Sequence, residues 1–225
     1  MSVAPASMLA TPAFIPAGLD GVLKHPGVWR RSASAQHHVR ALPTGLAELD
    51  ALLPGGGWPC GALSEILFAQ DGLGELALLM PALAELTHRR QRVVFVAPPY
   101  IPYAPALDMH GLDLRYVVHI QATPMEGAWS AEQCLRSGSC GAVLSWLPDA
   151  DYTQLRRLQL AAESGDALAF LFRPARAENK TSPAALRLQL HAHADEVNIE
   201  ILKCRGNLDQ RRPTRLRWSN IATAI

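Results

Sequence analysis

The stretch Leu63–Leu86, LSEILFAQDGLGELALLMPALAEL, joins an apolar strand to a turn with two glycines and then to a helical stripe of leucines. Nucleotide-binding proteins carry their phosphate loop in such a unit, with the pattern G-x-x-x-x-G-K-[ST]. Backbone N–H groups of that loop hold the phosphates, its lysine reaches the outer phosphates and its hydroxyl binds Mg²⁺. The stretch therefore predicts the central strand, loop and helix of an α/β fold.

The loop itself lacks the groups that hold a nucleotide. With Gly72 and Gly74 in the glycine positions, Glu75 replaces the lysine and Leu76 replaces the hydroxyl residue. A lysine about 4 Å from a phosphate contributes roughly 4 kcal/mol at an effective dielectric constant of about 20, and a carboxylate reverses the sign. Micromolar ATP binding amounts to only about 8 kcal/mol. The loop is therefore degenerate, and we expect no nucleotide cofactor.

The end of a later strand also lacks the residue that a nucleotide site would need there. Residues 141–147, GAVLSWL, predict a buried strand of the kind that ends in the Mg²⁺-binding aspartate of P-loop ATPases. Ser145 and Trp146 stand at that end, whereas Asp149 and Asp151 come later and are typical of a helix cap. Both halves of the nucleotide site are thus lost, and we expect no enzymatic activity.

Length and composition indicate one α/β domain with extensions. The chain has 225 residues, of which 49% are hydrophobic, and no run of about 18 uncharged apolar residues that could cross a membrane. Residues 1–19 lack the basic start and apolar block of a signal peptide, so we expect a cytoplasmic protein. Four cysteines without C-x-x-C spacing indicate reduced structural thiols: Cys60, Cys134, Cys140 and Cys204.

Apolar runs alternate with helical stripes along the middle of the chain. Residues 92–97, RVVFVA, and 167–172, ALAFLF, predict buried parallel strands, and 75–89 and 152–164 predict helices. Pro81 lies inside the first of these helices, where it should cause a local irregularity. Apolar and polar residues alternate over 186–201, which predicts an antiparallel hairpin with one wet face.

The charge distribution divides the chain into three parts. Residues 1–41 predict a flexible arm with a docking segment around Val28 and Trp29, because this tryptophan has too few apolar neighbours for a core of its own. It could dock on the chain's own core, on a second protomer or on a partner. Residues 42–204 predict the core, and residues 205–225, with five arginines against one aspartate, predict a basic tail.

The basic tail is a candidate partner-binding segment. It could contact single-stranded DNA through phosphate contacts and stacking, bind an acidic protein patch, or be simply solvated, and we favour partner binding. Its candidate residues are Arg211, Arg212, Arg215, Arg217 and Trp218.

Other candidate sites are weak. Tyr100 and Tyr103 lie in the proline-bounded loop 98–105 at a strand's carboxyl end, where α/β sheets bind ligands, but aromatic residues between prolines favour packing. His191 and His193 share a face, and two imidazoles alone make a poor metal site, so we expect no metal. No nucleophile–base or paired-carboxylate constellation can be assigned from spacing.

Several of these segments carry a family resemblance. Residues 42–67, LPTGLAELDALLPGGGWPCGALSEIL, 94–107, VFVAPPYIPYAPAL, and two blocks within 131–174 resemble the RecA-like superfamily and, within it, the ImuA proteins of bacterial SOS mutagenesis. The resemblance implies a RecA-like three-layer α/β/α domain with a mostly parallel central sheet, a C-terminal antiparallel hairpin and a degenerate P-loop. The latter half is also similar to SulA, a division inhibitor related to RecA without a working P-loop.

The ImuA resemblance implies a non-catalytic adapter of SOS mutagenesis and DNA repair, acting in translesion synthesis. The expected partners are an ImuB-like protein and an error-prone C-family polymerase. RecA, a second copy of the chain and, through the basic tail, DNA are further candidates. RecA pairs its protomers through a segment ahead of its core, and the Val28-Trp29 segment could do the same here.

Two alternatives stay open. The first is a SulA-like SOS cell-division inhibitor that binds the tubulin-like division-ring protein; residues 29–61, which resemble ImuA, weigh against it. The second is a true ATPase with a displaced lysine, and it is the weaker because no lysine lies near the loop: the chain has only Lys24, Lys180 and Lys203.

Overall fold

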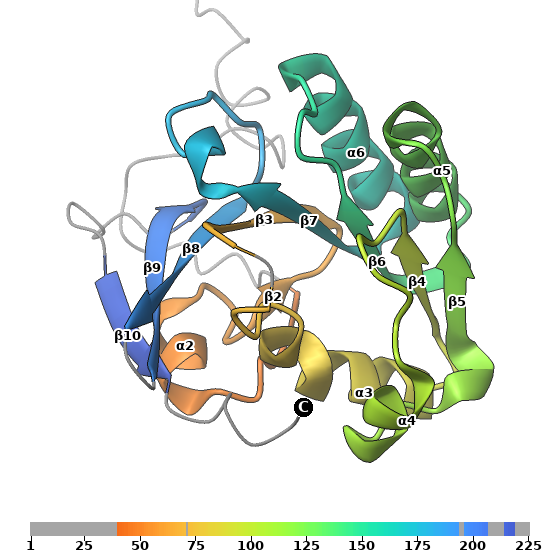
Figure 1. The fold of residues 1–225 in the computed structure, drawn as a ribbon, viewed down its shortest axis with the longest axis horizontal. Helices are drawn as coiled ribbons and strands as arrows, with labels where there is room; N and C mark the ends of the chain where they lie inside the picture. Colours follow the sequence, from red (N-terminus) through yellow and green to blue (C-terminus); the bar gives the residue numbers. More distant parts are fainter. Residues whose placement is uncertain (1–39, 71, 194–195, 207–213, 219–225) are drawn as a thin grey trace, which may run out of the picture. The chain divides into compact units, whose positions relative to one another are not determined.

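The computed structural model describes residues 40–70, 72–193, 196–206 and 214–218 (Figure 1). By its contacts the chain separates into residues 1–37 and 38–225, and all described residues belong to the second unit. Apart from residues 40 and 41, the predicted arm lies outside the described residues. The same is true of the docking segment at Val28 and Trp29.

Strands and helices alternate through most of the described chain. The short elements are β1 (Ala41–Leu42), β2 (Trp58–Pro59) and the 3₁₀ turns η1 (Ala77–Leu79), η2 (Leu114–Tyr116) and η3 (Ala175–Ala177). The helices are α2 (Ala47–Leu52), α3 (Met80–His88), α4 (Ala104–Met109), α5 (Pro124–Arg136) and α6 (Tyr152–Gly165). The main strands are β3 (Ala62–Phe68), β4 (Arg92–Val96), β5 (Val117–Ile120), β6 (Cys140–Trp146), β7 (Leu168–Pro174), β8 (Leu186–His193), β9 (Glu196–Cys204) and β10 (Thr214–Trp218).

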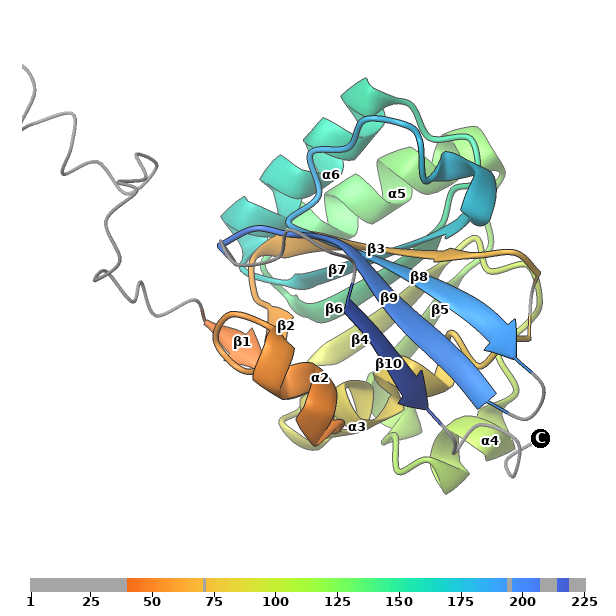
Figure 2. The same cartoon turned by 90° about the vertical axis from the view of Figure 1, so that its left-hand side faces the viewer.

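The main sheet is mixed and mostly parallel, as the sequence predicts. Its strand order is β10-β9-β8-β3-β7-β6-β4-β5, and every neighbouring pair from β8 to β5 is parallel. β8 and β9 form the predicted antiparallel hairpin, and β10 pairs antiparallel with β9 at the edge (Figure 2). β3, the strand of the opening stretch, lies inside the sheet between β7 and β8, and all seven of its residues are buried.

Helices lie against both faces of this sheet (Figure 1). On one face α5 and α6 pack against alternate residues of the central strands, among them Leu63, Val143 and Leu171. On the other face α2, η1 and α3 cover the opposite residues, including Ile66 and Phe170. Because both faces are buried, the parallel strands read as continuous apolar runs.

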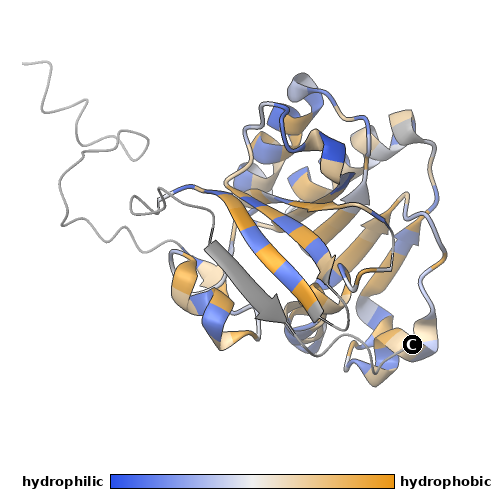
Figure 3. Ribbon diagram, turned by 60° about the vertical axis from the view of Figure 1, so that its left-hand side comes forward, coloured by the Kyte–Doolittle hydropathy of each residue, from blue (hydrophilic) through white to orange (hydrophobic). Residues whose placement is uncertain are grey.

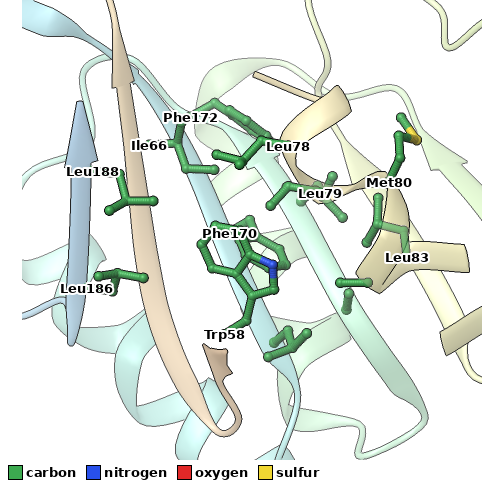
Figure 4. Packing of buried hydrophobic residues seen from close by; sticks show 14 of the residues in the cluster. Trp58, Ile66, Leu78, Leu79, Met80, Leu83, Phe170, Phe172, Leu186 and Leu188 are labelled. Carbon is green, nitrogen blue, oxygen red and sulfur yellow. The ribbon is translucent and has the colours of Figure 1, made fainter. Parts of the chain in front are cut away.

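An aromatic residue ahead of β3 anchors the second of these cores. Trp58 in β2 is fully buried, and its ring meets the Phe170 ring edge to face at a centroid distance of 5.1 Å (Figure 4). Leu79 and Leu83 lie in the same cluster. Leu42, Leu49 and Leu53 belong to it as well, so the segment 40–61 contributes side chains to this core.

The helix predicted over residues 75–89 begins later than expected. Residues 77–79 form the 3₁₀ turn η1, and the α-helix starts at Met80 with Pro81 in its first turn. Proline has no N–H to donate, and its ring clashes with the carbonyl four residues earlier, so it is tolerated at a helix start but not inside. The local irregularity expected at Pro81 is present, whereas the helical start at Glu75 was wrong.

The sequence predicted that the polar face of the β8–β9 hairpin would be exposed to water, and this prediction was wrong. Apolar and polar residues do alternate along both strands (Figure 3), but Arg187, Gln189 and Glu200 are all buried. The sequence pattern gave no sign that the segment 175–184 covers this side of β8. Contacts from Arg187 to the carbonyls of Ala177 and Glu178, at 2.8 and 3.1 Å, hold that segment in place.

A buried carboxylate in β3 contacts side chains from β7, from β8 and from the segment 175–184. Glu65 in β3 is fully buried; it accepts a hydrogen bond from Arg187 Nε at 3.0 Å and a short one from the Ser182 hydroxyl. Arg173 in β7 lies on its other side, with 3.7 Å between Nη1 and the Glu65 carboxylate. Arg173 Nη2 also donates to the Ala150 carbonyl at 2.8 Å. Two buried guanidinium groups thus share one carboxylate.

The predicted basic tail contains a strand. Residues 214–218 form β10, with Arg215 opposite Glu200 and Arg217 opposite Asn198 in the register with β9. Arg211 and Arg212 lie outside the described residues. The alternation TRLRW is short and follows a proline, so the sequence alone suggested no strand there.

Replacing Glu65 with alanine should destabilise the protein strongly. The substitution Glu65→Ala leaves Arg173 and Arg187 buried without their shared carboxylate, and removing one member of a buried pair costs about 3–5 kcal/mol of unfolding free energy. Urea unfolding followed by circular dichroism measures the loss. Glu85→Ala is the control, because it removes an exposed helical pair with Arg89 and should cost less than about 0.5 kcal/mol. Equal losses in the two variants would contradict this role of Glu65.

Candidate functional site: the carboxyl edge of the sheet

The loop between β3 and α3 is folded around its own glutamate. Gly72 and Gly74 both have φ of 83°, a conformation that favours glycine. The backbone N–H of Gly72 donates to the Glu75 carboxylate at 3.3 Å, and Leu76 packs against the apolar core. A backbone donor of the kind that holds phosphate in a P-loop is therefore turned toward an acidic side chain of the same loop.

The end of β6 is filled by aromatic packing. Trp146 stacks on Phe172 at a centroid distance of 4.4 Å and on Phe95 at 6.2 Å. Ser145 points to the other face, where its hydroxyl donates to the Phe170 carbonyl at 3.2 Å. The two residues at the predicted position of the metal-binding aspartate thus hold neighbouring strands together. Their packing roles could not be read from the strand's own sequence, because the stacking partners come from β4 and β7.

A crevice opens above this aromatic stack. Its volume is about 400 Å³, and it lies where several parallel strands end, the region in which open α/β sheets bind their ligands. The residues that line it are Phe68, Ala69, Gln70, Ala97, Pro99, Ala122, Trp146, Pro148, Phe172, Arg173, Pro174 and Arg176.

The charged residues of the crevice are already paired. The Arg176 guanidinium lies 3.1 Å from the Asp149 carboxylate, and both side chains are exposed. Arg173 lies beneath them, and its burial lowers the pKa of its guanidinium group, although the nearby Glu65 carboxylate opposes that effect. Asp149 therefore forms an ion pair with Arg176 and does not cap the next helix. Asp151 is the cap, and it forms the reciprocal capping box with Gln154.

The loop after β4 exposes its apolar side chains. Tyr100, Ile101 and Tyr103 are 73%, 80% and 71% exposed, so the packing expected for the two tyrosines was wrong. Prolines at 98, 99, 102 and 105 restrict the backbone of this loop and so limit the conformations that it can adopt. The ligand-facing alternative for this loop, which the sequence also offered, agrees better with these exposures.

Two further exposed apolar residues lie on the same edge. Met125 and Trp129 are in the first half of α5, directly after the end of β5, and β5 runs parallel to β4. Pro99 from the first loop and Ala122 from the second both line the crevice. The apolar edge is therefore defined as Tyr100, Ile101, Tyr103, Met125 and Trp129.

The other candidate residues that the structure describes are placed by backbone register or by single contacts. Arg215, Arg217 and Trp218 are placed by their strand register alone, and Trp218 lies opposite Val197. His191 Nε2 lies 3.4 Å from the Glu200 carboxylate. Within the described ranges, no group of three or more histidine, cysteine, aspartate or glutamate side chains could hold a metal ion. None of the helices in these ranges is long and apolar enough to cross a membrane.

The fold and the site together define a mixed α/β protein with an apolar, solvent-exposed edge beside a crevice. Residues 61–169 match the family model described as cell division inhibitor SulA. This segment runs from just before β3 into β7, and it includes the whole apolar edge. Over this central segment the chain is therefore similar to SulA.

Individual relatives agree with the family model. The chain is 28% identical to the cell division inhibitors SulA of Yersinia pestis strain Pestoides F and Yersinia pseudotuberculosis strain IP 31758, over 134 residues that cover 59% of this chain and 80% of each relative. A crystal structure of SulA from Pseudomonas aeruginosa matches 49% of this chain and 97% of that chain, with 26% identity and a TM-score of 0.43.

These matches overturn the expectation of an ImuA-type adapter in translesion synthesis. The matching family and the matching relatives are SulA, and that was the stated alternative. The argument against it rested on residues 29–61, which lie almost entirely ahead of the matched segment and therefore say little about its family. Binding to ImuB, to a polymerase or to RecA is not tested by the matches.

Trp146 and Trp129 should differ sharply in their effect on stability. Trp146→Ala removes the ring that stacks on Phe95 and Phe172 and should cost about 3 kcal/mol of unfolding free energy. Trp129→Ala removes an exposed ring and should change stability by less than about 0.5 kcal/mol. Urea unfolding of both variants tests the difference. A stable Trp146→Ala variant would show that the stack does not hold the strands.

Proposed function

We propose that the protein is a SulA-like inhibitor of cell division in the SOS response, which binds the tubulin-like division-ring protein and acts without catalysis. The observation that carries the proposal is the match of residues 61–169 to the SulA family model. All five residues of the apolar edge fall in that segment. An inhibitor of this kind needs a binding surface and no turnover.

The apolar edge is the docking surface in this proposal. Large exposed apolar side chains are candidates for interaction sites, and tyrosine and tryptophan are the residues that most often anchor protein interfaces. Tyr100, Tyr103 and Trp129 supply such anchors. The prolines limit the conformations of the loop before binding, which lowers the entropy lost when a partner is bound.

The crevice would receive side chains of the partner. Pro99 from the loop after β4 and Ala122 from the loop before α5 line it, and its floor is the ring stack of Trp146 and Phe172. The exposed Arg176–Asp149 pair at its border supplies a polar rim. An apolar centre with a polar rim is the usual composition of a protein interface.

Polar substitutions in the exposed loop should weaken this binding. Combining Tyr100→Ser, Ile101→Ser and Tyr103→Ser removes three anchors and should raise the Kd for the purified division-ring protein by about tenfold or more. Biolayer interferometry measures the Kd, and the length of bacteria that express each variant reports division. Cells with the triple variant should divide normally, whereas cells with the unaltered protein should form filaments.

A single exposed residue outside the edge provides the control. Leu160 in α6 is also apolar and exposed, so Leu160→Ser should change neither the Kd nor cell length. Circular dichroism should show the same unfolding midpoint for both variants within the error of the measurement. Unchanged binding in the triple variant would exclude the loop as the docking surface, and no binding by the unaltered protein would refute the proposed function.

We also propose that the sheet is a RecA-like ATPase framework that no longer binds nucleotide. The central position of β3, the glycine turn after it and the helices on both faces support this assignment. Glu75 and Leu76 stand where such a framework would carry its lysine and its Mg²⁺-binding hydroxyl. Trp146 and its neighbouring rings fill the position of the metal-binding aspartate.

Calorimetric titration with ATP and Mg²⁺ tests the loss of nucleotide binding. We expect no saturable heat, because a carboxylate near the phosphates repels them where a lysine would attract them. A parallel titration with the division-ring protein controls for inactive material. Saturable ATP binding would contradict our interpretation of Glu75 and Leu76, but it would leave the docking surface untouched.

A further inference from the structure

The crevice at the carboxyl edge of the sheet is lined by charges of one sign. Two of its lining residues are arginines, Arg173 and Arg176, and none of the described residues that line it is an aspartate or a glutamate. The amide of Gln70 is its other polar lining side chain. A cleft with apolar walls and charges of one sign attracts the opposite charge. The composition of the crevice therefore favours an anionic group.

Arg173 carries a positive charge that its own surroundings satisfy incompletely. Its side chain is fully buried, and its Nη2 donates to the Ala150 carbonyl at 2.8 Å. Within the described part of the chain, its Nε and Nη1 atoms have no hydrogen-bond partner. The Glu65 carboxylate lies 3.7 Å from Nη1, which is longer than a hydrogen bond, and it accepts hydrogen bonds from Arg187 and Ser182 instead.

The charged groups around Arg173 do not balance. Burial is the main cause that lowers the pKa of its guanidinium group; the charges that also shift this pKa are Glu65 and Asp149, which raise it, and Arg187 and Arg176, which lower it. A guanidinium group stays protonated in proteins, so the charge remains. Three arginines against two carboxylates leave one positive charge in excess. One negative group in the crevice would offset it.

Arg176 is the arginine of the crevice that a ligand can reach. It lies in η3, its side chain is 65% exposed, and its partner Asp149 is 80% exposed. An exposed ion pair is weak, because water solvates both charges. The guanidinium group can therefore exchange Asp149 for a better acceptor, and its planar shape allows it to hold a carboxylate through two hydrogen bonds.

We propose that the crevice binds the carboxylate of an aspartate or glutamate side chain of the division-ring protein, and that Arg176 is the direct contact. This inference rests on the proposed function and names the chemistry that the crevice recognises. The buried charge of Arg173 attracts the carboxylate without touching it. The rings of Trp146 and Phe172 pack against the methylene groups of the same acidic side chain.

The exchange of partners favours binding because the crevice is less wet than the surface. Pro99, Pro148 and the ring stack line it and displace water from the space around a bound carboxylate. Opposite charges attract more strongly where less water surrounds them, and salt screens them less. An ion pair in the crevice should therefore be stronger than the exposed pair of Arg176 with Asp149.

Neutralising Arg176 tests the inference. The probe is the purified division-ring protein, and biolayer interferometry measures its Kd for the full chain. Arg176→Gln removes the charge and should raise the Kd by about tenfold. Arg176→Lys keeps the charge but loses the planar donor pair, so its Kd should fall between those of the unaltered protein and the glutamine variant.

The partner of Arg176 separates ligand binding from a structural role of the ion pair. Asp149→Asn removes the competing carboxylate and leaves the guanidinium group available, so the Kd should decrease. If the pair only fixed the border of the crevice, Asp149→Asn and Arg176→Gln would weaken binding alike. Equal weakening in these two variants would overturn the inference.

A matched arginine elsewhere provides the control. Arg89 forms an exposed pair with Glu85 in the segment before β4, whereas the crevice-lining Ala97 follows that strand. Arg89→Gln should leave the Kd unchanged. Circular dichroism should show the same unfolding midpoint for Arg89→Gln and Arg176→Gln within the error of the measurement.

Substitutions in the probe identify the acidic group. Each surface aspartate and glutamate of the division-ring protein is changed singly to asparagine or glutamine. One of these changes should weaken binding to the unaltered chain by about tenfold and binding to Arg176→Gln by less than about twofold, because the two groups act as a pair.

The outcomes distinguish this inference from the proposed function. Binding by the unaltered protein together with an unchanged Kd for Arg176→Gln, or with no acidic residue of the probe coupled to Arg176, would overturn the inference and leave the proposed function standing. If the unaltered protein does not bind the division-ring protein, the proposed function fails and the inference fails with it.

Discussion

The contact on which the sheet depends is the carboxylate of Glu65 between two guanidinium groups. Glu65 lies in the most deeply buried strand, Arg187 is its partner in β8 and Arg173 is near it in β7. An isolated charge in such a place would cost many kcal/mol, so the strands on both sides of β3 and the segment 175–184 must keep their positions to satisfy it. The interaction therefore joins β3 to the strands on both of its sides.

The same network positions residues at the carboxyl edge of the sheet. Arg173 lies beside the Glu65 carboxylate and donates a hydrogen bond to the Ala150 carbonyl. It directly precedes Pro174, and both residues line the crevice. The stack of Trp146 and Phe172 forms the floor between the strands that this network aligns. At the carboxyl edge of the sheet, this chain has an internal hydrogen bond to Glu75, packed rings and an exposed apolar loop. The carboxyl edge has the composition of a protein-binding surface.

Sequence reasoning was accurate where one strand or helix contains its own signal. The strand over residues 62–68 and the helix capped by Asp151 were predicted because their apolar periods and capping residues are local. It failed where the signal was ambiguous between packing and exposure, as for Tyr100, or where a neighbouring segment decided the outcome, as for Arg187. The family assignment failed for a related reason, since residues 29–61 were given weight against SulA although the family match begins at residue 61.

The sequence by itself determined the alternation of strands and helices, the mostly parallel sheet and the loss of the lysine and hydroxyl after β3. These features depend on residue type and on spacing within a short stretch, and both can be read along the chain. Only the tertiary structure decided that Glu65 is shared by two arginines and that Trp146 stacks on Phe172. Each of these contacts joins residues from different elements, and their pairing depends on strand order and register, which no local pattern specifies.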